Sequence, residues 1–287
     1  MKFWVWLLSI LESEMPVPTT YGWFHLLWIA LAVSFTAFLC RRFGDCSDLV
    51  MRRIAIIVFI TLIVADLYRQ IVYDFVSYDA ELERFVWDYG WYAFPFQLCS
   101  AVHYVLPFVI WGREGRVRDA CISFLCFFST LGGVAVFLFP ESCFTPSVGV
   151  NIQTMLHHGM QISLGIFFAF HERRKLTLRY FLRGVPVFLA LVAVAIILNF
   201  TVHHVFVLIG SNDVFDMFYI SPYYTTTLPI IGVLKPALPY PIFLFVYILA
   251  ICLGAFLIYA TIIAAIFKKE SISKSGLNIF SIEKKGE

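Results

Sequence analysis

Seven stretches of this chain are apolar over about 20 consecutive residues, which is the length that an α-helix needs to cross roughly 30 Å of bilayer hydrocarbon. Inside lipid no water reaches the backbone N–H and C=O groups, so a single crossing segment must be helical. The sequence therefore predicts an all-α membrane protein, a bundle of seven transmembrane helices in one domain over residues 20–267. The predicted spans are Tyr21–Cys40, Ile54–Tyr73, Trp91–Trp111, Cys121–Phe139, Ile152–Phe170, Val185–Phe206 and Pro241–Phe267.

The composition excludes a soluble domain. Of the 287 residues, 61% are hydrophobic and only 14% are charged, which leaves too few charges for a water-facing surface. The net charge is +2, and no stretch resembles a nucleic-acid-binding patch. We therefore expect a membrane partner and no nucleic-acid partner.

The basic residues predict how the bundle is oriented. Seventeen of the 21 Lys and Arg fall on one side of the predicted spans, and only Lys2, Arg69, Arg84 and Lys235 fall on the other. By the positive-inside rule the N-terminus lies outside, the C-terminus lies inside, and the protein is a multi-pass protein of the cell membrane.

The segments outside the spans differ in character. Residues 1–19 are expected to form an interfacial N-terminal segment, because the apolar run Met1–Leu11 is too short to span. Residues 268–287 are predicted to be a polar cytoplasmic tail. The aromatic connection 210–240 is expected to lie on the membrane surface or to fold back over the bundle as a lid. Because only Cys143 of the seven cysteines falls in an outer connection, no extracellular disulfide is expected.

The third predicted span begins with a polar segment, Pro95–His103, whose sequence is PFQLCSAVH. Polar side chains are expensive in lipid, so those that persist usually face the bundle interior, a cavity or a reaction site. In a continuous helix His103 lies one turn beyond Cys99 on the same face. Within this segment Gln97 and Ser100 are candidate donors to a developing oxyanion.

The fifth predicted span also begins with polar residues, in the run NIQTMLHHGMQ from Asn151 to Gln161. At about 1.5 Å rise per residue, His158 lies roughly 10 Å below Asn151, a depth similar to that of Cys99. His157 is adjacent to His158 and points about 100° away from it, so at most one of the two aims at Cys99. We take His158 as the first candidate and His157 as the second.

A thiol beside an imidazole is a plausible nucleophile and base for acyl transfer. Two structural alternatives stay open, because buried free cysteine often only packs, and His158 with Gly159 would also suit an interhelical hydrogen bond.

Charged and further histidine side chains lie inside or near other spans. Asp66 and Arg69 are candidate site residues of the second span, although at i and i+3 they would also neutralise each other. His203 and His204 end the sixth span, but no HxxxH spacing accompanies them, so neither a metal nor a cofactor is expected.

Four short polar signatures together resemble a known family. They are Pro95-x-Gln97-Leu98-Cys99-Ser100, Asp66, His158-Gly159 and Gly210-x-Asn212, and they resemble the YwaF-type integral membrane proteins of bacteria. These look like distant relatives of the eukaryotic transmembrane acyltransferases that remodel ether phospholipids and of the androgen-induced hydrolases of fatty-acid esters. The resemblance implies a seven-helix fold that handles a fatty acyl group, with a nucleophile on one helix and a histidine on another, and it adds Asn212 to the candidate substrate-binding residues.

The chain departs from that pattern at two positions. A histidine commonly stands where this chain has Gln97, and in the acyltransferase branch the cysteine follows the proline directly, where this chain has Phe96. A phenylalanine cannot act as a nucleophile, so Cys99 is the candidate.

The residues thus favour a lipid acyltransferase or acyl-ester hydrolase that takes a membrane lipid or fatty acyl substrate. The alternative is a non-enzymatic transporter, channel or lipid-binding protein with a polar path between its helices. A retinal-type receptor is excluded, because the predicted span Pro241–Phe267 holds no lysine for a Schiff base, whereas a plain ligand-sensing receptor stays open without a residue that supports it.

Overall fold

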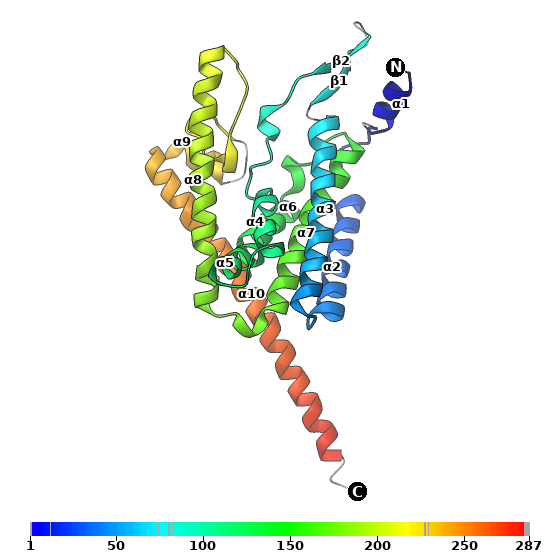
Figure 1. Cartoon of the computed structure of the whole chain (residues 1–287), viewed down its shortest axis with the longest axis vertical. Coiled ribbons are helices and arrows are strands. Elements are labelled where there is room, and N and C mark those ends of the chain that lie inside the picture. The colour runs from blue at the N-terminus through cyan, green and yellow to red at the C-terminus, as the bar shows by residue number, and fades with distance from the viewer. Residues whose placement is uncertain are drawn as a thin grey trace.

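Long helices run side by side along the length of the molecule (Figure 1). The computed structural model describes residues 2–11, 13–73, 75–79, 81, 83–226, 228 and 230–283. The α-helices are α1 (Lys2–Leu11), α2 (Trp23–Phe43), α3 (Asp48–Tyr68), α4 (Ala101–Ile110), α5 (Arg116–Phe124), α6 (Thr130–Leu138), α7 (Val148–His171), α8 (Leu178–Ile209), α9 (Ile231–Ala237) and α10 (Tyr240–Glu283). The predicted all-helical class is confirmed, apart from one small hairpin of β1 (Val76–Asp79) and β2 (Arg84–Trp87).

Four helical segments in the described part of the chain are long and apolar enough to cross a membrane: Trp23–Phe43, Arg116–Leu138, Leu178–Ile209 and Tyr240–Ile266. The helices α3 and α7 have 21 and 24 residues, but they carry more polar side chains. The class of multi-pass membrane protein is supported, whereas the count of seven spans and the orientation of the termini stay predictions.

The third predicted span is not one helix. Residues Trp91–Ala93 form a single 3₁₀ turn, the chain is then non-helical, and α4 begins only at Ala101. The cause is Pro95, because a proline disfavours helical dihedrals in the residue before it, and Phe94 has φ −50° and ψ 129°. Cys99 therefore precedes α4, and the prediction that Cys99 and His103 share one helical face is wrong.

The centre of the bundle is the segment Arg116–Leu138. Of the 18 residues that make up its apolar stretch, 72% are buried, whereas only 17% are buried in the corresponding stretch of α2. It consists of α5, a π-helical stretch Leu125–Ser129, and α6. The helix α5 packs along α8, while α6 and α2 both pack along α7. The helix α7, packed against α2 and α6, has most of its polar side chains buried among protein.

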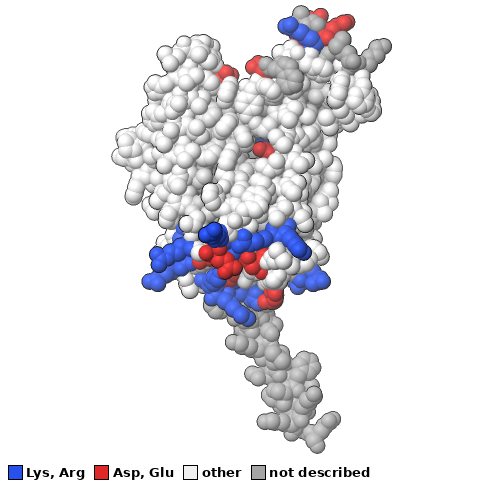
Figure 2. Space-filling view, viewed as in Figure 1, with Lys and Arg blue, Asp and Glu red and all other residues white. Residues whose placement is uncertain are grey.

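Charged side chains gather at one end of the bundle, where Lys and Arg surround a group of Asp and Glu (Figure 2). We call this the basic end. It holds the α2–α3, α4–α5 and α7–α8 connections. The ion pair Arg173–Asp45 joins two of these connections, and Arg183–Asp119 joins the start of α8 to α5. The predicted asymmetry of charge is present, and the compartment that this end faces stays a prediction.

At the other end the connection after α8 folds into the bundle. Phe215, Met217, Phe218 and Ile220 are buried, and Asn199 of α8 bonds both the N–H and the carbonyl of Met217. Of the two expectations for residues 210–240, the structure has the one in which the connection folds back over the bundle.

The two ends of the chain are helical in the described residues. The N-terminal segment forms α1, and α10 continues to Glu283 through most of the expected polar tail. Residues 284–287 of that tail lie outside the described residues. Whether α1 lies at the membrane interface stays a prediction.

Candidate functional site

The polar start of α7 is used for capping. Ser147 accepts a hydrogen bond from the N–H of Val150, as N-cap residues do. Asn151 bonds both the N–H and the carbonyl of Thr145. These side chains fix where α7 begins, so the part of the polar run that remains for a site lies deeper in the helix.

About two and three turns beyond Asn151, α7 meets the segment that carries Cys99. The main-chain carbonyl of Cys99 accepts hydrogen bonds from His157 Nε2 at 3.3 Å and from Gln161 Nε2 at 3.1 Å. His157 and Gln161 are four residues apart, so both lie on the same face of α7. The structure therefore brings the predicted thiol segment and the predicted histidine segment together.

His157, and not His158, faces the Cys99 segment. His158 Nδ1 lies 2.6 Å from the carbonyl of Thr154 in its own helix. Our first choice of His158 is therefore corrected to His157, because adjacent helical residues point about 100° apart and α7 turns residue 157 toward Cys99.

The hydrogen bonds assign the proton positions of both rings. A carbonyl oxygen only accepts, so His157 carries its proton on Nε2 and His158 carries its proton on Nδ1. This leaves His157 Nδ1 and His158 Nε2 as basic nitrogens, and both are buried without a hydrogen-bond partner among the described residues. His103 Nε2 is in the same condition, and the His103 and His157 rings meet edge to face with centroids 5.2 Å apart.

The Cys99 thiol makes no hydrogen bond to these rings among the described residues. Its hydrogen-bond contact within the described chain is Ser100 Oγ at 4.0 Å. Cys99 is partly buried, and the nearby Ser100 and His103 are 9% and 8% exposed. We call the set Cys99, Ser100, His103, His157, His158 and Gln161 the polar cluster.

The charged candidates of α3 lie close to this cluster. Arg69 is within electrostatic range of Cys99, His157 and His158, and it also interacts with Asp66. Asp66 and Arg69 thus interact electrostatically, and their role as site residues stays a prediction.

Two predicted binding residues are used elsewhere. Gln97 donates its amide N–H to the carbonyl of Asp216 at 2.9 Å, which ties the segment before Cys99 to the folded-in connection after α8. Asn212 is exposed in that connection and does not join the polar cluster. The chain turns inward only from Phe215 onward, and the assignment of Asn212 as a binding residue stays a prediction.

The structure brings no metal-binding group together in the residues that it describes. His203 stacks on Tyr223 with ring centroids 3.6 Å apart, and its Nδ1 lies 3.2 Å from the Tyr224 hydroxyl. His203 and His204 thus belong to the junction of α8 with the following connection.

Sequence reasoning missed two parts of the site. Gln161 was seen only as one polar residue of a run, although its spacing of four from His157 would have placed it on the same face. Asp216 and Lys235 form a buried ion pair at 2.6 Å, with side chains 8% and 9% exposed. No local sequence pattern predicts this pair, because the two residues are brought together by the fold of the connection.

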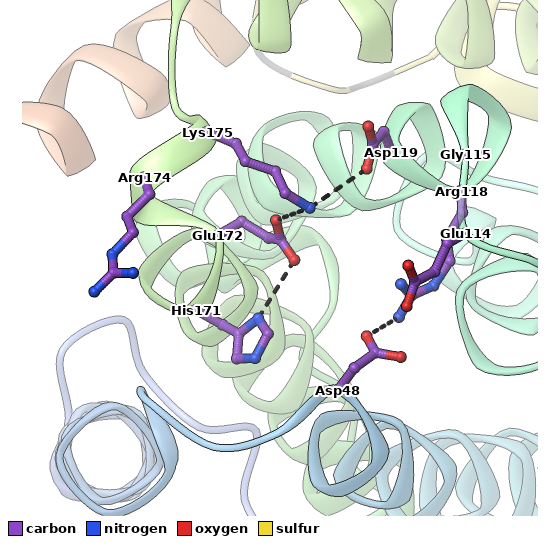
Figure 3. Close-up of a pocket in the computed structure, with 9 residues that line it drawn as sticks. All are labelled: Asp48, Glu114, Gly115, Arg118, Asp119, His171, Glu172, Arg174 and Lys175. Atoms are coloured by element: carbon purple, nitrogen blue, oxygen red, sulfur yellow. Dashed lines mark hydrogen bonds and ion pairs between the residues drawn. The ribbon is translucent and has the colours of Figure 1, made fainter.

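A second polar site lies at the basic end. A cavity of about 420 Å³ is lined by two ionic groups, Asp48 with Arg118 and a chain formed by His171, Glu172, Lys175 and Asp119 (Figure 3). Glu172 lies 3.4 Å from His171 Nδ1 and 2.7 Å from Lys175 Nζ, while His171 Nε2 donates to the carbonyl of Cys46 at 3.0 Å. This group joins the α2–α3 connection to the end of α7.

The interaction with the Glu172 carboxylate raises the pKa of His171 above its ordinary value, although burial opposes this. Burial raises the pKa of Glu172, but hydrogen bonds from His171 and Lys175 outweigh it, so that pKa falls below its ordinary value. The pair is therefore most stabilising when both groups are charged.

These shifts predict how stability depends on pH. A raised histidine pKa contributes stability that is complete below about pH 6.5 and is lost as the pH rises through the folded-state pKa. A lowered glutamate pKa contributes stability that is complete above about pH 4.5 and is lost as the pH falls through the folded-state pKa.

The variant His171→Gln is expected to be less stable than the wild type by on the order of 1 kcal/mol between about pH 4.5 and pH 6.5, and this difference is expected to fade at higher pH. It is measured by thermal melting of both proteins in detergent from pH 4 to 9. A His171→Gln effect of equal size at pH 6 and pH 9 would contradict the assignment.

Comparison with known proteins gives one family. A family model described as the TMEM164 family matches residues 20–259. No curated protein and no solved structure matches. The match covers α2 through the first 20 of the 44 residues of α10 and includes every residue of the polar cluster.

Proposed function

The chain belongs to the TMEM164 family of membrane proteins, and from that premise we propose that it is a membrane enzyme that transfers or hydrolyses the acyl group of a lipid ester. The observation that carries the proposal is the contact of His157 Nε2 with the main-chain carbonyl of Cys99, because it brings the residue that bears the thiol against an imidazole whose Nδ1 is buried without a hydrogen-bond partner among the described residues. The proposed topology has seven spans in the cell membrane, with the N-terminus outside and the C-terminus inside.

In the proposed reaction the Cys99 sulfur attacks the carbonyl carbon of the ester while His157 Nδ1 takes the thiol proton. The tetrahedral intermediate collapses, the bond to the leaving oxygen breaks, and His157 returns the proton to that oxygen, which leaves as an alcohol. Water or the hydroxyl of a second lipid then attacks the acyl thioester, with His157 again holding the proton until the thiol leaves. The Ser100 hydroxyl is the nearest candidate donor to the oxyanion.

Asp66 and Arg69 are proposed to organise the charge of the site, since both interact electrostatically with the thiol. The same pair supports the alternative of a transporter, channel or lipid-binding protein, because charged residues of a spanning helix often line a substrate path. In that case Asp66→Asn or Arg69→Gln alters flux or ligand affinity, while Cys99→Ala has no effect.

The proposal is tested by trapping the acyl-enzyme. Purified protein in lipid nanodiscs is incubated with phospholipid esters that carry an alkyne-tagged acyl chain, and the Cys99 peptide is examined by mass spectrometry. We expect a hydroxylamine-sensitive acyl group on Cys99 and a loss of acyl transfer of at least about 10²-fold in Cys99→Ala. Cys252→Ala of α10 is the matched control and is expected to remain active. Full transfer by a Cys99→Ala protein that inserts normally would overturn the proposal.

A further inference from the structure

The amide of Gln161 is buried at the meeting point of three segments. It donates to the carbonyl of Cys99 at 3.1 Å and to Ser129 Oγ at 2.9 Å, and the residue is only 1% exposed. The carbonyl of Cys99 takes its second hydrogen bond from His157, one helical turn away on α7. Gln161 thus links the Cys99 segment to the face of α7 on which His157 lies.

Two glycines of α6 lie beside this amide. A Cβ added at Gly132 would lie 3.6 Å from both Gln161 Nε2 and Cys99 Cα, and one added at Gly133 would lie 3.5 Å from Gln161 Oε1, which are ordinary packing distances. At Gly133 the added Cβ would also lie 2.8 Å from Ile162 Cγ1 and 3.0 Å from the His158 carbonyl oxygen, so these atoms would have to shift. Gly133 therefore lets α6 approach α7 closely beside the amide.

Burying an amide is unfavourable unless its hydrogen bonds are made, and Gln161 Oε1 has no partner within the described residues. An apolar side chain of the same length would fill this space without that penalty. The two N–H bonds to Cys99 and Ser129 are what an apolar side chain would lack.

We infer that Gln161 is a positioning residue that holds the Cys99 main chain against His157, so that the thiol and the imidazole can serve one site. The inference rests on the proposed function for its role in the reaction. Without the amide the Cys99 carbonyl keeps only the longer bond, 3.3 Å, from His157 itself. The segment between Pro95 and Ala101 is non-helical, and its backbone bond from the Ala101 N–H to the carbonyl of Gln97 does not engage the Cys99 carbonyl.

The test measures the reactivity of Cys99 directly and does not require turnover. Full-length protein in detergent is treated with N-ethylmaleimide from pH 6 to 10, and the rate is followed for the Cys99 peptide by mass spectrometry. The variants are Gln161→Met, which keeps the length but removes the donors, and Gln153→Met, a matched change of another buried glutamine on α7.

We expect Gln161→Met to slow the alkylation of Cys99 about tenfold near neutral pH and to move its pH profile upward, because the thiol loses its base. Gln153→Met is expected to react within about twofold of the wild type. In a His157→Ala background the Gln161→Met effect is expected to disappear, since residues that act through one interaction are not additive. A merely structural role instead predicts faster alkylation of Cys99 with an unshifted pH profile, and that result would overturn the inference.

One further variant keeps the test decisive if Gln161→Met does not fold. Ser129→Ala removes one of the two bonds that fix the amide and is expected to slow Cys99 in the same direction by a smaller factor, whereas no change would overturn the inference. Failure of the proposed function is separate, because a protein without acyl transfer whose Cys99 reactivity still depends on Gln161 and His157 retains the positioning role.

Discussion

Replacing His157 with glutamine is expected to lower acyl transfer by about 10²- to 10⁴-fold, the usual effect of removing a general base. Glutamine still donates an N–H toward the carbonyl of Cys99, as His157 Nε2 does at 3.3 Å, but it has no atom that takes a proton. The variant thus separates the base from the structural contact. The measurement is kcat/KM for transfer from a tagged lipid ester, together with the melting temperature in detergent.

The matched control is His158→Gln, because that ring is equally buried and adjacent but bonds its own helix through Thr154. We expect it to lose tenfold or less. Equal losses at both positions would mean that the cluster acts as a unit without a single base, and full activity of His157→Gln would remove the catalytic role assigned to it.

Replacing Lys235 with methionine is expected to destabilise the protein by about 3–5 kcal/mol, the cost of leaving one partner of a buried ion pair without the other. Lys235 Nζ lies 2.6 Å from Asp216, whose other carboxylate oxygen accepts the N–H of Ser221. Both side chains are almost fully buried, so water cannot replace the lost cation. The change is measured as the free energy of unfolding in detergent and as proteolysis of the connection after α8.

Two comparisons define this result. The double variant Lys235→Met with Asp216→Asn is expected to recover much of the stability, because it removes the uncompensated charge. Arg183→Gln breaks the more exposed ion pair with Asp119, and we expect it to change stability by about 1 kcal/mol or less. A Lys235→Met effect no larger than that of Arg183→Gln would show that the pair does not fasten this connection.

The ion pair also bears on the site. Gln97 donates to the carbonyl of Asp216 and lies two residues before Cys99. This hydrogen bond therefore links the folded-in connection to the thiol segment. Loosening the connection is therefore expected to reach Cys99 through Gln97.

The sequence predicted the helical class and most helix positions well, because length and apolar character decide what crosses lipid. It predicted the third span least well. The apolar content of residues 91–111 favours one helix, but Pro95 breaks it, and the freed chain then pairs its polar groups with α7 and with Asp216.

The candidate site was predicted in its parts and not in its assembly. The sequence singled out Cys99, His157, His103 and Arg69. It did not predict which histidine faces Cys99, and it did not predict the contact of Gln161. Depth along a helix follows from residue number, but the rotation of a helix depends on what it packs against, and adjacent histidines differ by about 100°.

The amino-acid sequence alone predicts a multi-pass helical membrane protein with a polar segment around Cys99. It does so because the length of an apolar stretch and the unfavourable free energy of burying polar groups depend only on the residues. Only the tertiary structure decided that His157 and Gln161 hold the Cys99 carbonyl and that Lys235 meets Asp216. Those contacts join residues 19 to 62 positions apart. Such pairings are fixed by packing, to which local sequence gives no direct clue.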